Sequence, residues 1–183
     1  MTIKVDGING LTFADNSTQN VTALNASNIT SGTLGKARMA TGSVLQVVNA
    51  QYSTSTTTNT STFQDTGLTA TITPTSATSK ILVLVSNSCA STNSAGVNTV
   101  SYFQTVRGAS TVIAYTRFQI GNALASGTNA IKVDTVTQTA LDSPATTSAT
   151  TYKMQMISNE ATVTTTSCIN STVAQITLLE IAA

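Results

Sequence analysis

Acid–base chemistry in this chain would depend on its seven carboxylates, because the sequence contains no histidine. These are Asp6, Asp15, Asp65, Asp134, Asp142, Glu160 and Glu180. Glycosidic bonds are hydrolysed by two carboxylates about 5 to 10 Å apart. No two stand close in the sequence, although folding could bring Asp134 and Asp142 together. Isolated aspartates are more often turn residues, so we expect the protein not to be an enzyme.

The two cysteines, Cys89 and Cys168, are the other candidates for metal or redox chemistry. Two thiols cannot complete a tetrahedral zinc site when no histidine is present to help. We expect two small, buried or half-buried thiols. A disulfide is the less favoured alternative, because the first residues do not resemble a secretion signal. Since no glycine-rich phosphate loop is present either, we expect no metal and no cofactor.

A binding site is the remaining chemical possibility, because aromatic rings beside amides and hydroxyls suit carbohydrates. Tyr102, Tyr115, Phe118 and Arg117 are candidates for such a site. The alternative is that these aromatic residues fill the core, since the chain has only eight Phe and Tyr and no Trp. Loops displayed by a rigid scaffold are better candidates for receptor contact, at residues 88–98, 121–130 and 143–150. The contact residues themselves stay unknown.

The composition favours strands and turns around a weakly charged surface. Thr, Ser and Asn make up 73 of the 183 residues, and charged residues only 8%, against about 25% in typical domains. Thr favours strands, whereas Ser and Asn favour turns. The net charge is +1 with no basic cluster, so we expect no nucleic-acid partner. No apolar run approaches the roughly 20 residues of a membrane span, so we expect no membrane insertion.

Apolar and polar residues alternate over many short segments between residues 44 and 183. Residues 80–85 are continuously apolar after Lys80, which predicts a strand buried on both faces. Gly108 lies between two strand-like runs and predicts a hairpin. Residues 151–158 place Tyr152, Met154 and Met156 on one face of a strand. About eight such strands predict an all-β fold, a jelly-roll-like β-sandwich over 44–183.

The first 43 residues follow a different pattern. Their apolar residues are isolated, and four of them recur every fifth position, namely Leu24, Ile29, Leu34 and Met39. This spacing fits neither a helix nor a strand. A single copy could not bury enough apolar surface to become ordered, whereas three chains around one axis could. We therefore expect an extended N-terminal segment, with 1–20 for attachment and 21–43 as a trimeric stem.

Two phrases in this segment resemble those of bacteriophage tail fibres. Residues 10–19 (GLTFADNSTQ) are similar to a recurring fibre phrase, with Asn16 where glycine is usual. Residues 25–34 (NASNITSGTL), followed by ARM at 37–39, resemble a fibre linker that precedes a C-terminal β domain. The later phrases SKILV (79–83), LDSP (141–144) and ITLLEI (176–181) also look like small β domains of virus particles. The resemblance covers most of the chain.

The resemblance implies a homotrimeric virion fibre or spike that attaches to a host or particle surface. Its partners would be other phage virion proteins, through the N-terminal segment, and a host surface glycan or protein. It would lie on the tail or head exterior. A head decoration or cement protein is the alternative, and a secreted bacterial lectin-like protein is a third reading. The sequence does not distinguish tail from head, nor does it identify the host, the receptor or the copy number.

Overall fold

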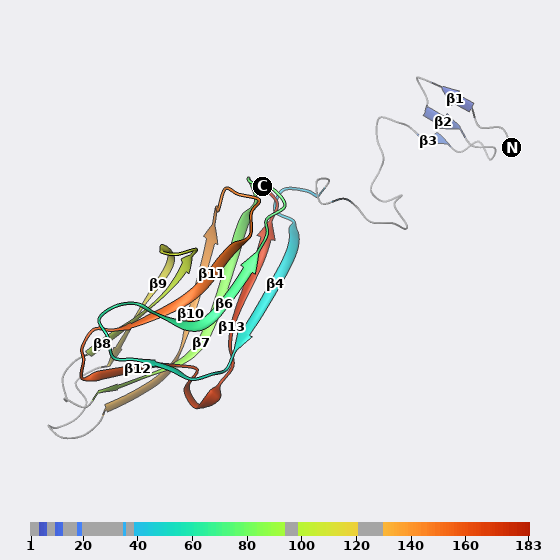
Figure 1. The fold of residues 1–183 in the computed structure, drawn as a ribbon. Coiled ribbons are helices and arrows are strands. Elements are labelled where there is room, and N and C mark those ends of the chain that lie inside the picture. Colours follow the sequence, from blue (N-terminus) through green and yellow to red (C-terminus); the bar gives the residue numbers. More distant parts are fainter. Residues whose placement is uncertain are drawn as a thin grey trace. The chain divides into compact units, whose positions relative to one another are not determined.

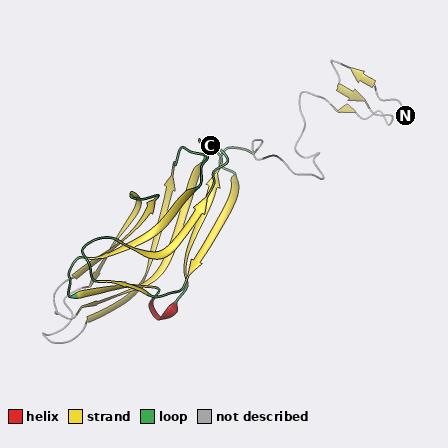
Figure 2. Cartoon of the chain, viewed as in Figure 1, coloured by secondary structure: helices red, strands yellow, loops and turns green. Residues whose placement is uncertain are grey.

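The computed structural model describes residues 4–6, 10–12, 18–19, 35, 39–93, 99–120 and 130–183. The chain forms two compact units, Met1–Arg38 and Met39–Ala183, and each is described by itself. The described residues form only β-strands and their connecting loops, with the exception of one 3₁₀ turn at Ile169–Ser171 (Figure 2). The prediction of an all-β fold is therefore confirmed.

The N-terminal unit contains three short antiparallel strands. These are β1 (Lys4–Asp6), β2 (Gly10–Thr12) and β3 (Thr18–Gln19), hydrogen-bonded in the order β1-β2-β3. The unit therefore includes a small meander within the segment that the sequence predicts to attach to a particle. Three of the predicted stem residues, Leu24, Ile29 and Leu34, lie outside the described residues.

The second unit is built from ten strands (Figure 1). They are β4 (Val44–Tyr52), β5 (Thr56–Thr58), β6 (Gln64–Ile72), β7 (Lys80–Asn93), β8 (Thr99–Arg107), β9 (Thr111–Ile120), β10 (Ala130–Asp142), β11 (Thr150–Ser158), β12 (Val163–Ser167) and β13 (Ala174–Ile181). The hairpin predicted around Gly108 is confirmed as β8 and β9, and Gly108 adopts a φ of +61° in its turn. Glycine accepts this left-handed conformation without steric cost.

The strand order is that of a jelly roll. In one sheet the strand order is β4-β13-β7-β10. The long strand β7 pairs on one edge with β10, and on its other edge first with β13 and then, toward Asn93, with β12. Strand β5 pairs with the outer edge of β12. The other sheet runs β6-β11-β8-β9. The four antiparallel pairs β4–β13, β6–β11, β7–β10 and β8–β9 build the two sheets, and the first three join strands far apart in sequence. This double Greek key is the jelly-roll arrangement, so the predicted fold is confirmed.

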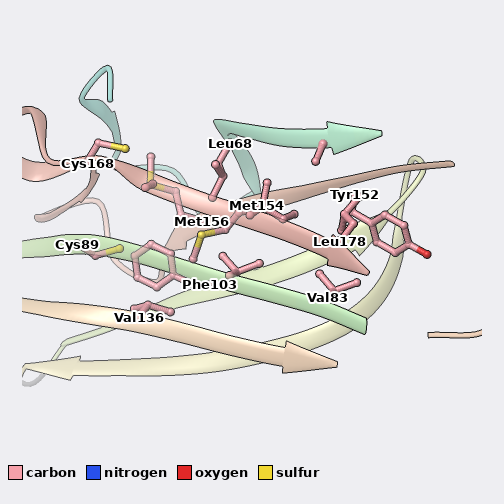
Figure 3. Close-up of a cluster of buried hydrophobic side chains, with 14 of the residues drawn as sticks. Leu68, Val83, Cys89, Phe103, Val136, Tyr152, Met154, Met156, Cys168 and Leu178 are labelled. Atoms are coloured by element: carbon pink, nitrogen blue, oxygen red, sulfur yellow. The ribbon is translucent and has the colours of Figure 1, made fainter. Parts of the chain in front are cut away.

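The core lies between the two sheets and is filled by alternate residues of each strand (Figure 3). In β11, Tyr152, Met154 and Met156 are fully buried, as their alternation predicts. They pack with buried residues of the facing sheet such as Val83 and Leu178. Each fully buried large side chain contributes about 1.5–3 kcal/mol. The core is thus the main source of stability in this unit.

β7 differs from its prediction in two ways. Burial on both faces is wrong for residues 80–85, because Ile81, Val83 and Val85 are buried while Leu84 is 38% exposed. The predicted loop at 88–98 is also wrong for residues 88–93, which continue β7 as far as Asn93. The polar half of β7 is held by β10 along its full length and by β12 on its other edge. This pairing outweighs the weak strand propensity of Ser and Asn.

Gly67 in β6 is required by a close approach of Tyr52. Its φ is +92°, and a Cβ there would overlap Cζ of Tyr52 and lie 2.6 Å from Cε1. We expect Gly67→Ala to lower the free energy of unfolding by about 2–3 kcal/mol, through backbone strain and a displaced ring. Urea denaturation monitored by circular dichroism measures the loss.

Gly42→Ala is the matched control for this prediction. Gly42 has a similar φ of +87°, but a Cβ added to it would have no other atom within 4 Å. The Gly42→Ala variant therefore measures only the cost of a positive φ at alanine, and its free energy of unfolding should fall by about 1 kcal/mol. Equal losses in the two variants would show that the Tyr52 contact adds nothing.

Candidate ligand-binding face

The outward face of the β6-β11-β8-β9 sheet carries a row of polar side chains. Tyr115 in β9 lies directly opposite Gln104 in β8, Gln104 lies opposite Gln155 in β11, and Gln155 lies opposite Asp65 in β6. Directly opposed residues of antiparallel strands share one face of the sheet. The four strands therefore place two amides and one carboxylate, the polar row of Gln104, Gln155 and Asp65, in a continuous line that ends at Tyr115.

Hydrogen bonds connect three members of this row. Nε2 of Gln104 donates to Oε1 of Gln155 at 2.8 Å, and Nε2 of Gln155 donates to Oδ1 of Asp65 at 2.7 Å. Nζ of Lys153 donates to the other carboxylate oxygen of Asp65 at 2.8 Å, forming an ion pair. These bonds fix long side chains that would otherwise be mobile. The row is thus ordered before any ligand arrives.

The pKa of Asp65 reflects these neighbours. Burial by itself raises the pKa of this carboxyl, but hydrogen bonds from Lys153 and Gln155 and the positive charge of Lys153 lower it below its usual value. Asp65 is therefore a carboxylate at neutral pH. Lys153, beside the row, balances this negative charge, so the row and Lys153 together are neutral.

Three aromatic rings gather beside the row. Tyr102 and Tyr115 are stacked, with centroids 5.3 Å apart and planes at 28°, and Phe63 meets Tyr115 edge-on at 6.4 Å and 71°. Tyr115 is 54% exposed, whereas Tyr102 and Phe63 are half-buried. Burial, and secondarily Tyr102, raises the pKa of the Tyr115 hydroxyl. The face therefore offers a neutral, rigid aromatic surface with a polar line beside it.

The structure separates the aromatic candidates that the sequence analysis grouped together. Tyr115 and Arg117 are exposed and Tyr102 is half-buried, so these three lie on the outward face. Phe118 is buried instead, meets Phe103 edge-on at 6.0 Å, and has Nζ of Lys132 4.6 Å from its centroid. The core alternative therefore holds for Phe118, while Tyr102, Tyr115 and Arg117 stay candidates by position alone. Phe63 and the polar row were not among the sequence candidates.

The carboxylates Asp134 and Asp142 do not meet. Both lie in β10, whose pairing with β7 is uninterrupted, and eight residues of strand separate them by about 26 Å. Oδ2 of Asp142 accepts hydrogen bonds from Arg107 and from the Tyr152 hydroxyl, each at 2.7 Å. Burial, followed by Asp142, raises the pKa of Tyr152. The suggested glycosidase pair is therefore wrong, and Asp142 instead joins the two sheets.

The two cysteines are buried free thiols, as expected. Burial, and next the proximity of Cys168, raises the pKa of Cys89, which disfavours the reactive thiolate. Among the described residues no group of three His, Cys, Asp or Glu could hold a metal ion. No helix in the described part of the chain is long and apolar enough to cross a membrane.

The remaining predicted positions can be placed only in part. Met39, the last of the proposed stem residues, is 41% exposed at the start of the second unit. Of the three suggested receptor loops, residues 94–98 and 121–129 lie outside the described residues. The loop at 143–149 is described, and it borders a surface pocket of about 430 Å³ together with the Gly108 turn.

The geometry thus defines an antiparallel jelly-roll protein with an ordered aromatic and amide face. No protein-family model and no curated protein matches the sequence. Among solved structures, the chain is similar to one in "Structure of infectious bursal disease virus Gx strain", at 9% identity and a TM-score of 0.30. The similarity covers 75% of this chain and 37% of that chain, so this chain spans well under two thirds of its length.

Proposed function

We propose that this protein is a non-enzymatic structural component of a bacteriophage particle, a trimeric fibre or spike subunit that attaches to a host or particle surface. The observation that carries the proposal is the ordered aromatic and amide face on a rigid jelly roll. The fibre-like phrases at residues 10–19 and 25–34 support the assignment to a phage particle. Attachment by such a protein is a binding function and requires no catalytic residue.

Trimer formation would raise the avidity of the protein for a surface, even if each single face binds weakly. Three copies on one axis present three equivalent faces, and binding of the second and third becomes intramolecular. Leu24, Ile29, Leu34 and Met39 are the proposed axial residues of the stem. In this arrangement the N-terminal residues 1–20 contact other virion proteins.

The mass of the protein in solution tests this proposal. We expect full-length protein to give about three times 18.8 kDa by light scattering during size-exclusion chromatography. Residues 39–183 should give the mass of one chain. This truncation keeps Gly42 and Ser43, whose backbones bond to Ala182 at 2.8 and 2.9 Å. A full-length monomer would contradict the fibre proposal.

The alternative is a head decoration protein, and the outward face of the larger sheet favours it. Val47, Leu179, Leu82 and Leu141 lie in one register row across β4, β13, β7 and β10. Val47 and Leu141 are each 57% exposed. Lys80 is the one charged residue at an outward position of these four described strands. Depletion of charge is typical of the centre of protein interfaces. A trimer that survives truncation would favour this face and this alternative.

A further inference from the structure

The outward face of the smaller sheet has the chemistry of a carbohydrate site. We propose that Tyr102, Tyr115 and Phe63, with the polar row of Gln104, Gln155 and Asp65, bind pyranose units of a surface glycan. The inference rests on the proposed attachment function, because that function supplies a reason for a glycan to be present. It goes further by naming the ligand class and the residues that hold it.

The aromatic rings fit one side of a sugar ring. A pyranose with equatorial hydroxyls exposes a flat set of C–H groups, which carry a small positive charge. The face of an aromatic ring is negative because of its quadrupole, so it attracts these C–H groups. Tyr115 is exposed by 54% and is held in place by Tyr102 and Phe63 at 5.3 and 6.4 Å. Little conformational entropy is lost when a ligand covers a ring that is already fixed.

The polar row fits the hydroxyl groups of successive sugars in a short oligosaccharide, because three strand spacings, about 14 Å, separate Tyr115 from Asp65. Gln155 is half-buried and uses one bond of an amide nitrogen that carries two hydrogens, whereas Gln104 is only 8% exposed and holds Gln155 in place. The second hydrogen and the carboxylate of Asp65 offer a donor and an acceptor in one line. A sugar hydroxyl is both donor and acceptor, so it pairs with such a mixed row. Tyr115 and Gln155 lie on either side of Gln104 in the same register row, so ring and amide contact successive parts of one ligand.

The charges around the rings favour a glycan over a protein partner. Asp65, Lys153 and Arg117 border the aromatic group, whereas the centre of a protein interface is usually depleted of charge. The larger sheet carries one apolar row outward, Val47, Leu179, Leu82 and Leu141, and no aromatic ring at an outward position of its described strands β4, β13, β7 and β10. The pocket beside Gly108 has no aromatic residue in its lining, and its Arg107 is held by Asp142 at 2.7 Å. Neither offers the combination that a sugar requires.

A glycan array tests the proposal directly. Labelled full-length protein is applied to a printed array of bacterial surface polysaccharides and pyranose oligosaccharides, and the strongest binder is then titrated. We expect wild type to bind at least one glycan and Tyr115→Ala to weaken that binding at least tenfold. Tyr115→Phe keeps the ring and should stay within about threefold. Val173→Ala removes an exposed apolar side chain just before β13, outside both candidate faces, and should bind as wild type does.

Three outcomes would overturn the proposal. One is no binding to any glycan by a folded wild type. Another is equal binding by wild type and Tyr115→Ala, which would place the contact elsewhere. The third is a wild type that binds no glycan and a Tyr115→Ala variant that loses oligomer mass. In that case the aromatic face would contact a second copy of the chain. A trimer without glycan binding refutes this inference alone, whereas a glycan-binding monomer refutes the fibre proposal alone.

Discussion

Replacing Glu180 with glutamine should lower the free energy of unfolding by roughly 3 kcal/mol at pH 7. Glu180 lies in β13 and is fully buried. Its Oε1 accepts from both the backbone N–H and the hydroxyl of Thr75 at 2.7 Å, and its Oε2 accepts from Gln46 at 2.6 Å. Glutamine would direct an N–H₂ group at one of these donors. The anchor between β13 and the turn after β6 would then be broken.

The same carboxylate should make stability depend on pH. Burial alone would raise the pKa of Glu180, but hydrogen bonds from Thr75 and Gln46 outweigh it and lower the pKa from 4.5 to about 2. The unfolded chain therefore takes up the proton more readily between these values. The contribution is fully present above about pH 5 and is lost as the pH falls through about 2. Wild type should lose roughly 3 kcal/mol over this interval through Glu180.

Urea denaturation at several pH values between 7 and 2 measures both effects. Glu180→Gln should show a flatter pH dependence than wild type. Glu160→Gln removes the same charge from an exposed position and should change stability at pH 7 by less than about 0.5 kcal/mol. If Glu180→Gln and wild type lose stability in parallel as the pH falls, the carboxylate is not the acid-sensitive group.

Alternation along single strands made much of the fold predictable. Tyr152, Met154 and Met156 alternate with polar residues, and the structure buries all three. The same rule could have separated two aromatic candidates. Tyr115 and Phe118 stand three residues apart in one strand, so their side chains must face opposite sides. The sequence therefore contained the signal that only one of the two could belong to the core, and the structure shows that it is Phe118.

The polar row of the candidate site was beyond such reasoning. Gln155 alternates with the buried Met154 and Met156, so its outward position follows from its own strand, but its neighbours Gln104 and Asp65 are 51 and 90 residues away in the chain. Which residues meet across strands depends on register, and register is set by the whole core and its turns. Local sequence cannot supply it, because a shift of one residue would reverse every face.

The polar end of the core was missed for a related reason. Residues 88–93 (SCASTN) lack the large apolar side chains of a core strand, and their Ser and Asn locally favour turns. In the structure the Ser91 hydroxyl bonds to Ser101 at 2.7 Å, and Ser101 bonds to Thr165 at 2.6 Å, all three buried. Buried hydroxyls are tolerated when each has a partner. Partners from β8 and β12 therefore convert turn-forming residues into the interior of a sheet.

Asn87 offers the sharpest test of this polar core, and Asn87→Leu should lower the free energy of unfolding by roughly 2–4 kcal/mol. Its side chain is 1% exposed in β7. Nδ2 donates to the Ser167 hydroxyl at 2.7 Å and to the Met154 sulfur at 3.3 Å, while Oδ1 accepts from the Cys168 backbone N–H at 3.2 Å. Leucine has similar size but would leave the Ser167 and Cys168 groups buried without these partners.

The backbone conformation at Cys168 makes the expected loss of stability in Asn87→Leu larger than the loss expected when other buried amide side chains are replaced. Cys168 has a φ of +54°, which is unfavourable for a residue other than glycine. The bond from its N–H to Asn87 helps to hold the conformation that leads into the turn Ile169–Ser171. Without that bond, the turn between β12 and β13 loses one of its fixed points. We therefore expect hydrogen exchange to become faster at 167–172 in the variant than elsewhere in the sandwich.

Asn49→Leu is the matched control, because Asn49 lies in β4 with an exposed side chain whose Nδ2 donates to the Thr177 hydroxyl at 2.8 Å. Water can replace that partner, so the loss should stay below about 0.5 kcal/mol. Urea denaturation of both variants gives the comparison. If Asn87→Leu is no less stable than Asn49→Leu, the buried amide is dispensable. The polar end of the core would then be held by β7–β10 pairing and by packing rather than by its side-chain hydrogen bonds.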